Sequence, residues 1–200
     1  MLWKRALMAV GVLGLLVASF VLPGVLNKKT TPAGAAHAMA MGAEPGAGLS
    51  MGSAAPAFSE RDLLSGRPVT STSVEGQKTL LFFSEGIMCQ ACFEQIQGLQ
   101  QVGAELQKRG IRLVSITLDS PGDLEQAVSQ YGITTPVISD SDGNMSAAFN
   151  VLGQGMHADT PGHAFALIDR GKVLWYRDYW LAPYRTMYVQ PQRLLQDIPK

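Results

Sequence analysis

The stretch Thr79-Leu-Leu-Phe-Phe-Ser-Glu-Gly-Ile-Met-Cys89-Gln-Ala-Cys92-Phe-Glu-Gln-Ile96 decides how this chain folds. It begins with a short apolar run, residues 80–83, which has the length of a buried strand. The polar and flexible residues 84–86 end that run. The only two cysteines of the protein, Cys89 and Cys92, follow with two residues between them. The stretch therefore predicts a strand, a turn and a cysteine pair in immediate succession.

The residues after the cysteines show helical periodicity. Apolar side chains recur at intervals of three and four residues, at Phe93, Ile96, Leu99, Val102 and Leu106. We expect one helix that ends at Lys108-Arg109-Gly110, with basic residues before a C-terminal glycine. Cys89 then lies near the helix N-terminus, where backbone amides and the helix dipole stabilise a thiolate. Cys92, one turn further on, can reach Cys89 and close a disulfide, which is the geometry of a redox dithiol.

The rest of the chain continues the alternation of strands and helices. The turn Arg170-Gly171 between two apolar runs is a strong hairpin signal. A strand–helix–strand–helix order followed by an antiparallel hairpin and a helix predicts an α/β fold with a mixed central sheet flanked by helices. We expect further strands at 111–118, 136–138, 163–169 and 172–179, and helices at 124–131, 145–152 and 190–198.

From about Ala57 onward the chain resembles the thioredoxin-like superfamily, in its redoxin branch of AhpC/TSA-like and membrane-anchored extracytoplasmic thioredoxin-like proteins. The resemblance rests on the cysteine pair between a strand and a helix and on the hairpin downstream. It implies a thioredoxin-like fold over residues 57–200, with a β-hairpin extension at 57–74. It also implies that Cys89 is the catalytic nucleophile and Cys92 the resolving thiol, which cycle between dithiol and disulfide.

Composition and cysteine count narrow the function. The formal net charge is zero, so nothing suggests a nucleic-acid partner. Zinc would need two more ligands, and His37, His157 and His163 are not paired at metal spacing, so we expect no metal and no cofactor. A purely structural disulfide is disfavoured because closing so short a loop removes little chain entropy.

The N-terminus indicates a membrane segment. Ala6 to Leu26 carries no charge, and about 21 apolar residues are long enough to span a bilayer. We expect residues 1–27 to be an uncleaved anchor, because small residues at cleavage spacing occur only beyond the apolar run; a cleaved signal sequence is the alternative. The catalytic domain is then expected on the extracytoplasmic side of the cell membrane, on its periplasmic or extracellular face.

Residues 28–56 are rich in Ala, Gly and Pro and predict a flexible linker. Their His37, Met39, Met41 and Met51 carry the soft and imidazole ligands that suit copper. Compositional coincidence in an Ala/Gly/Met linker explains them as well. We therefore keep a copper-binding module of the same fold only as an alternative, disfavoured because copper chaperones of this fold space their cysteines more widely.

A proline is the second element of the predicted site, after the cysteine pair. In the thioredoxin-like fold a proline, usually cis, starts the strand opposite the dithiol, and the residue before it offers backbone hydrogen bonds to the substrate. Thr160-Pro161 precedes the strand expected at 163–169 and matches that position by context. Thr135-Pro136 is the rival, and two ordinary trans prolines are the plain alternative.

Two ionisable residues are candidates for proton transfer or thiolate tuning. Glu85 lies four residues before Cys89, and a partly buried carboxylate could move protons to the resolving thiol. His163 follows the proposed proline, where its cation would favour the Cys89 thiolate. Alternatively, Glu85 is a solvated residue at the end of a strand, and His163 is a strand histidine whose hydrogen bonds are purely structural. His157 lies in a glycine-rich loop and could approach the site.

The chain differs from the usual motifs of thiol peroxidases and of thioredoxins, and these differences indicate which activity to expect. A thiol peroxidase normally has Thr or Ser three residues before its peroxidatic cysteine, where this chain has Gly86. Thioredoxins usually have Trp before the first cysteine and Gly-Pro between the pair, where this chain has Met88 and Gln90-Ala91. The sequence therefore predicts a thiol–disulfide oxidoreductase acting on protein thiols and disulfides, with a thiol peroxidase as the second reading.

Overall fold

The computed structural model describes residues 48–157 and 159–200. The predicted membrane anchor and most of the predicted linker, with His37, Met39 and Met41, lie outside this part. Within the described ranges, no helix has the length and apolar character that crossing a bilayer requires.

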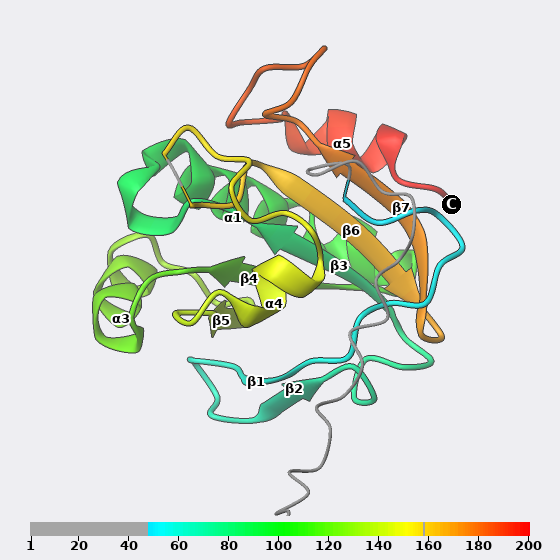
Figure 1. The fold of residues 1–200 in the computed structure, drawn as a ribbon, viewed down its shortest axis with the longest axis horizontal. Coiled ribbons are helices and arrows are strands. Elements are labelled where there is room, and N and C mark those ends of the chain that lie inside the picture. Colours follow the sequence, from blue (N-terminus) through cyan, green and yellow to red (C-terminus); the bar gives the residue numbers. More distant parts are fainter. Residues whose placement is uncertain (1–47, 158) are drawn as a thin grey trace, which may run out of the picture. The chain divides into compact units, whose positions relative to one another are not determined.

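The described chain is built on a five-stranded mixed sheet with the strand order β5-β4-β3-β6-β7 (Figure 1). Strands β3, β4 and β5 run parallel, whereas β6 pairs antiparallel with both β3 and β7. The strands are β3 (Lys78–Phe83), β4 (Ile111–Thr117), β5 (Val137–Ser139), β6 (Ala164–Asp169) and β7 (Lys172–Asp178). A separate antiparallel pair is formed by β1 (Ser59–Arg61) and β2 (Pro68–Thr70).

The helices are short and follow the strands. Five α-helices and one 3-10 helix occur in the described residues. They are η1 (Gly86–Met88), α1 (Gln90–Gln101), α2 (Gly103–Lys108), α3 (Pro121–Gln130), α4 (Asn144–Ala148) and α5 (Pro191–Asp197).

Strand β3 is the centre of the sheet, and both of its faces are buried. Leu80 and Phe82 cluster with apolar side chains of α1, α3 and α5. Leu81 and Phe83, which point to the opposite face, cluster with residues of the β1–β2 pair and of α4. Because side chains alternate across a strand, a continuous apolar run is what a strand covered on both faces requires. The strand that leads to the dithiol is therefore packed against apolar side chains on both of its faces.

The predicted mixed sheet, its flanking helices and the hairpin turn at Arg170-Gly171 are confirmed. Ser120 caps α3 by accepting a hydrogen bond from the Asp123 amide, with Pro121 at the first helical position. The β6–β7 hairpin turns at Arg170 and Gly171, both with positive φ, as a two-residue turn of this hand requires.

Two helix predictions are wrong, and one short helix was not predicted. The single helix expected up to residue 108 is divided in two, because Val102 leaves the helical conformation with φ −99° and ψ 13° before Gly103, a poor helix former. The helix expected over 145–152 ends at Ala148. The turn before Cys89 contains η1, which the sequence analysis did not predict.

The folded unit also begins earlier than the predicted boundary at residue 57. The Gly52 amide donates to Val173 O over 2.7 Å, and the Ala55 amide donates to Gly171 O over 2.9 Å. Ala54 also forms an isolated bridge with Lys172. The last residues of the predicted linker are thus bonded along β7, since the outer edge of that strand offers unpaired backbone groups.

Candidate active site

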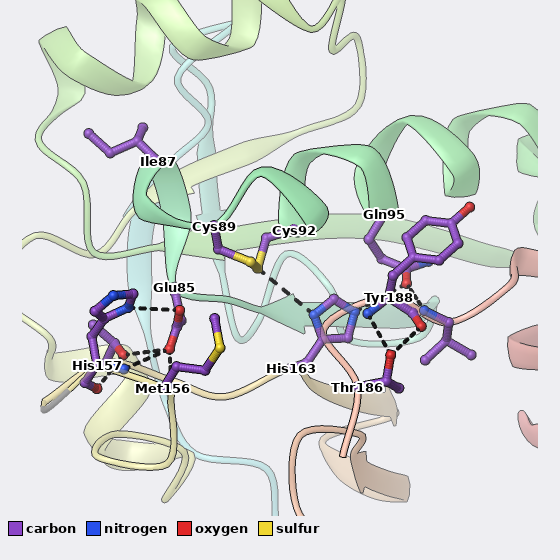
Figure 2. Close-up of a disulfide and its surroundings, with 12 residues drawn as sticks. Glu85, Ile87, Cys89, Cys92, Gln95, Met156, His157, His163, Thr186 and Tyr188 are labelled. Carbon is purple, nitrogen blue, oxygen red and sulfur yellow. Dashed lines mark hydrogen bonds and ion pairs between the residues drawn. A yellow bond between two sulfur atoms is a disulfide. The ribbon is translucent and has the colours of Figure 1, made fainter. Parts of the chain in front are cut away.

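Cys89 and Cys92 form a disulfide at the N-terminus of α1 (Figure 2). Cys89 is the N-cap residue of the helix, and its carbonyl accepts the first helical hydrogen bond from the Cys92 amide, over 3.0 Å. Cys89 is 4% exposed and Cys92 is fully buried. Met187 packs against the pair, together with the half-buried Trp180. Both cysteines are therefore buried, and Cys89 is the more accessible of the two.

The connection from β3 to the dithiol is held by an acidic residue on the next loop. Gly86 has φ +77°, and a Cβ atom at this position would overlap the carboxylate of Asp119. Both oxygens of that carboxylate accept from the Ile87 amide, over 3.2 and 3.1 Å. Burial raises the pKa of Asp119. Glycine at position 86 thus has a steric reason, since only it permits this turn and this close approach.

Glu85 is buried, and its carboxylate binds the loop that precedes β6. Oε1 accepts hydrogen bonds from the Met156 amide, from the His157 amide over 3.0 Å and from Thr160 Oγ1 over 3.2 Å. Oε2 accepts from His157 Nδ1 over 3.0 Å. The structure thus brings Glu85 and His157 together, but they hydrogen-bond to each other and not to a sulfur atom.

Thr160 and Pro161 lie in this same loop, immediately before β6. The one cis peptide bond in the described residues joins Ala182 and Pro183, so the expected cis bond before Pro161 is wrong. The backbone groups of Thr160 are also engaged: its carbonyl accepts from the Gly155 amide over 2.9 Å, and its amide donates to His157 O over 3.3 Å. The substrate-binding role of Thr160 and Pro161 remains a prediction.

His163 is the predicted residue that reaches the dithiol. Its Nδ1 lies 3.9 Å from Cys92 Sγ, and its Nε2 lies 3.1 Å from Gln95 Oε1. The ring is fully buried, and this burial lowers its pKa to about 3. The expected cation beside Cys89 is therefore wrong in two respects, because the imidazole is neutral and it contacts the other cysteine.

Sequence analysis missed two polar residues that hold His163. Gln95 is fully buried and lies one turn after Cys92 on α1. Asp178 is buried at the end of β7, where its Oδ1 accepts from the His163 amide over 3.1 Å and from the Trp180 amide over 2.8 Å. Burial raises the pKa of Asp178. The spacing of Gln95 from Cys92, three residues on a helix, was the available signal.

The surroundings of the dithiol that face solvent are apolar. Ile87 and Met88 on η1 are 46% and 68% exposed, and Met156 is 49% exposed. No group of three or more His, Cys, Asp or Glu side chains that could hold a metal ion occurs in residues 48–157 and 159–200. The chemistry available to this site is therefore that of the Cys89–Cys92 disulfide and of His163, which contacts it.

A sheet of this order, with a Cys-x-x-Cys disulfide at the start of the first helix after its central strand, defines a thioredoxin-like thiol oxidoreductase. A family model described as "AhpC/TSA family" matches residues 51–177. The chain belongs to the AhpC/TSA family, and the predicted redoxin membership is confirmed.

Individual relatives agree with this placement. Peroxiredoxin Bcp of Escherichia coli K12 is 31% identical over 106 residues, which cover 53% of this chain and 67% of the relative. The crystal structure of peroxidoxin BcpB from Mycobacterium tuberculosis shares the fold with a TM-score of 0.62 at 20% identity, covering 76% of this chain and 99% of that one. A Chlorobium tepidum structure, named as a candidate thiol:disulfide interchange protein DsbE, gives 0.55 at 26% identity and covers 65% and 86% of the two chains.

Proposed function

We propose that this protein is a thiol–disulfide oxidoreductase that exchanges its Cys89–Cys92 couple with disulfides or thiols of other proteins. The observation that carries the proposal is the disulfide between Cys89 and Cys92 at the start of α1, in which Cys89 keeps a small exposed fraction of 4% and Cys92 has none. A substrate can approach only the first of them, which is the division of labour that a nucleophile and a resolving thiol need.

The cycle follows from this placement. In the reduced protein, the α1 N-terminus favours the Cys89 thiolate through unpaired amides and the helix dipole. The thiolate attacks one sulfur of a substrate disulfide and forms a mixed disulfide, and the other substrate sulfur leaves. Cys92 then attacks Cys89 Sγ, closes the internal disulfide and releases the reduced substrate. The exposed apolar side chains of Ile87 and Met88 are suited to contact a polypeptide around its cysteine.

The N-terminal residues supply the rest of the proposal. Residues 1–27 carry an apolar run of membrane-spanning length between basic residues. We propose that this segment anchors the protein in the cell membrane, with residues 57–200 acting on the extracytoplasmic side. A test is the accessibility of the domain to protease in intact and in permeabilised cells.

A thiol peroxidase is the second candidate, favoured by the 31% identity to a protein named peroxiredoxin. Against it, Gly86 stands where a peroxidase of this family has a hydroxyl that orients the peroxide. The residue cannot be replaced by Thr without a clash, because a Cβ there overlaps Asp119. The positive φ of Gly86 and its close approach to Asp119 disfavour a hydroxyl-bearing residue at this position of this chain, which supports disulfide exchange over peroxide reduction.

The reduction potential of the couple in the full-length chain is the primary test. We expect one reversible two-electron transition between about −270 mV, typical of a reductant, and about −120 mV, typical of an oxidant. Insulin disulfide reduction should be catalysed by the protein and fall at least about a hundredfold in Cys89→Ala. Full reductase activity in that variant, or peroxide consumption that exceeds disulfide reduction, would contradict the proposal.

A further inference from the structure

We propose that His163 is the group that takes the proton from the resolving thiol Cys92, and that Gln95 is a positioning residue that holds this histidine in the required tautomer. The inference rests on the proposed dithiol cycle and adds to it the fate of the proton. It reassigns His163 from the nucleophile, where sequence analysis expected it to act, to the buried partner.

The tautomer of His163 follows from its neighbours, because a backbone N–H can only donate a hydrogen bond and an amide oxygen can only accept one. The backbone N–H of Val189 donates to Gln95 over 2.7 Å, so the atom of Gln95 that receives it must be the amide oxygen Oε1. The same oxygen lies 3.1 Å from His163 Nε2. An oxygen of this kind only accepts, so Nε2 carries the hydrogen. In a neutral imidazole Nδ1 is then a bare acceptor, and it faces Cys92 Sγ at 3.9 Å.

The surroundings keep this imidazole neutral until a proton arrives from the sulfur. Phe82 and Phe165 enclose the ring, with centroids 4.7 and 5.5 Å from it, and no part of His163 is exposed. The titratable groups in hydrogen-bonding contact with His163 are Cys92 of α1 and Asp178 of β7, and Asp178 binds its backbone amide rather than its ring. The ring therefore has an unprotonated nitrogen at neutral pH, consistent with a pKa lowered to about 3 by burial.

The proton balance of the cycle closes with this assignment. In the mixed disulfide, Cys92 still carries its S–H hydrogen. As Cys92 Sγ attacks Cys89 Sγ, the hydrogen passes to His163 Nδ1, the Sγ–Sγ bond forms and the bond from Cys89 to the substrate sulfur breaks. The substrate sulfur leaves as a thiolate, and the proton on His163 passes to that stronger base, so the buried imidazole returns to its neutral form. One dithiol has been oxidised and one substrate disulfide reduced.

Glu85, the other candidate for this role, directs its carboxylate at the loop before β6 and has no hydrogen bond to either sulfur atom. Its Oε1 accepts three hydrogen bonds from the loop, and its Oε2 accepts one from His157. A carboxylate with these partners stabilises a loop, whereas an imidazole with one bare nitrogen toward sulfur can move a proton.

An aryl disulfide reagent mixed with the reduced full-length protein separates the two sulfur attacks. The first coloured thiolate is released when Cys89 attacks, and the second when Cys92 resolves the mixed disulfide. In His163→Asn, whose amide can hydrogen-bond but cannot take a proton, we expect an unchanged first phase. We expect the second phase to slow by about a hundredfold at neutral pH. A Cys92→Ser control should release only the first equivalent.

The pH profile of the second phase distinguishes proton transfer from packing. It should be nearly flat between about pH 6 and 8 in the unmodified protein, where Nδ1 is always available. In His163→Asn, and in the shape-filling His163→Phe, it should rise about tenfold per pH unit, since Cys92 must first ionise to solvent. A second phase of unchanged rate and flat profile in both variants overturns the proposal. Failure of the first phase in the unmodified protein would instead contradict the proposed function.

Gln95 variants test the positioning role. Gln95→Met removes the acceptor, so we expect the ¹⁵N shifts of the His163 ring to show the Nδ1–H tautomer and the second phase to slow about tenfold. Gln95→Glu keeps an acceptor for both Val189 and His163 and should preserve the Nε2–H hydrogen and most of the rate. An Nδ1–H tautomer in the unmodified protein, or equal rates in the two Gln95 variants, contradicts the assignment.

Discussion

Two buried polar groups flank the same disulfide, and they differ in how many of their hydrogen-bonding sites are used. Glu85, at the end of β3, is surrounded by donors from the loop at residues 155–160. His163, just before β6, has one nitrogen bound to Gln95 and the other directed at Cys92 Sγ. Figure 2 shows them on opposite sides of the cysteine pair in that view.

The difference teaches how to separate a structural group from a chemical one. Both residues are ionisable, buried and close to the dithiol in sequence or space, so type and burial alone do not distinguish them. A group whose hydrogen bonds all go to the donors of a loop, with none directed at a sulfur atom, is not placed to take a reacting proton. The direction of the hydrogen bonds is therefore the better guide, and the following predictions are designed to test it.

Replacement of Glu85 by Ala should have the largest effect on stability. It leaves the amides of Met156 and His157 without their acceptor, and each such group costs about 1–3 kcal/mol, whereas the Thr160 hydroxyl keeps the His157 carbonyl. We expect the free energy of unfolding in urea to fall by about 4 kcal/mol. Glu85→Gln, which retains an amide oxygen for the loop, should lose less than half of that.

The same two variants test whether Glu85 is only structural. At a temperature where both are folded, the rate of disulfide closure measured with the aryl reagent should match that of the unmodified protein. A closure rate at least tenfold slower in Glu85→Gln would show that the carboxylate takes part in proton transfer and would remove the contrast with His163.

Acid should destabilise the protein through His163. The unfolded imidazole titrates near its ordinary pKa of 6.5 and the folded one near 3, so between these values the unfolded state binds more protons. The free energy of unfolding therefore falls as the pH falls through this window, by roughly 2 to 3 kcal/mol at about pH 4.5. Asp178, whose pKa is raised by burial, acts in the opposite direction at the acidic end.

This pH dependence is measured by urea unfolding of the unmodified protein and of His163→Phe over the same pH series. The difference between the two curves isolates the histidine, because Asp178 is common to both. If the curves stay parallel between pH 7 and 4.5, His163 is not held neutral in the folded state.

Gly155→Ala should have a smaller effect and should act on the Glu85 side alone. A Cβ atom at this position would overlap Thr160 Oγ1, Glu85 Oε1 and the carbonyl of Pro161. Overpacking of this kind costs about 1–3 kcal/mol. We expect a fall of about 2 kcal/mol by thermal or urea unfolding, whereas Gly153→Ala in the same loop, where φ is +77° but nothing lies near, reports the backbone cost alone.

His157→Ala should have the smallest effect. The side chain is 49% exposed, so its bond from Nδ1 to the fully buried Glu85 carboxylate is weakened by solvent. We expect a loss of no more than about 1 kcal/mol in urea unfolding and no change in the dithiol rates. A loss as large as that of Glu85→Ala would show that the imidazole, rather than the loop amides, neutralises the carboxylate.

Much of the fold was predictable because the signals are local. The apolar run of β3, the capping residues of α3 and the turn at Arg170-Gly171 each act within a few residues. The break at Val102 was not predictable from the helical periodicity, which continues across it. The pairing of Ala54 with Lys172 joins residues far apart in the chain and leaves no mark in the linker composition.

The site was predictable in its sulfur atoms and much less so in their partners. Cys89 and Cys92 are marked by their spacing and by the strand before them. Gln95 looks like a surface residue of an amphipathic helix, and only the arrival of His163 and Val189 from distant segments explains its burial. The charge state of His163 depends equally on enclosure by rings from two strands, which no local pattern encodes.

The contact of Val189 with Gln95 has a consequence for biosynthesis. Synthesis runs from the N-terminus, so the dithiol on α1 emerges roughly one hundred residues before the segment that fixes the tautomer of His163. Until that segment is made, Gln95 lacks the Val189 donor that orients its amide toward His163. The segment around Met187 and Val189, which is synthesised well after the dithiol, completes the site, and a chain that lacks it would leave the cysteines without the packing of Met187 and Gln95 without its donor.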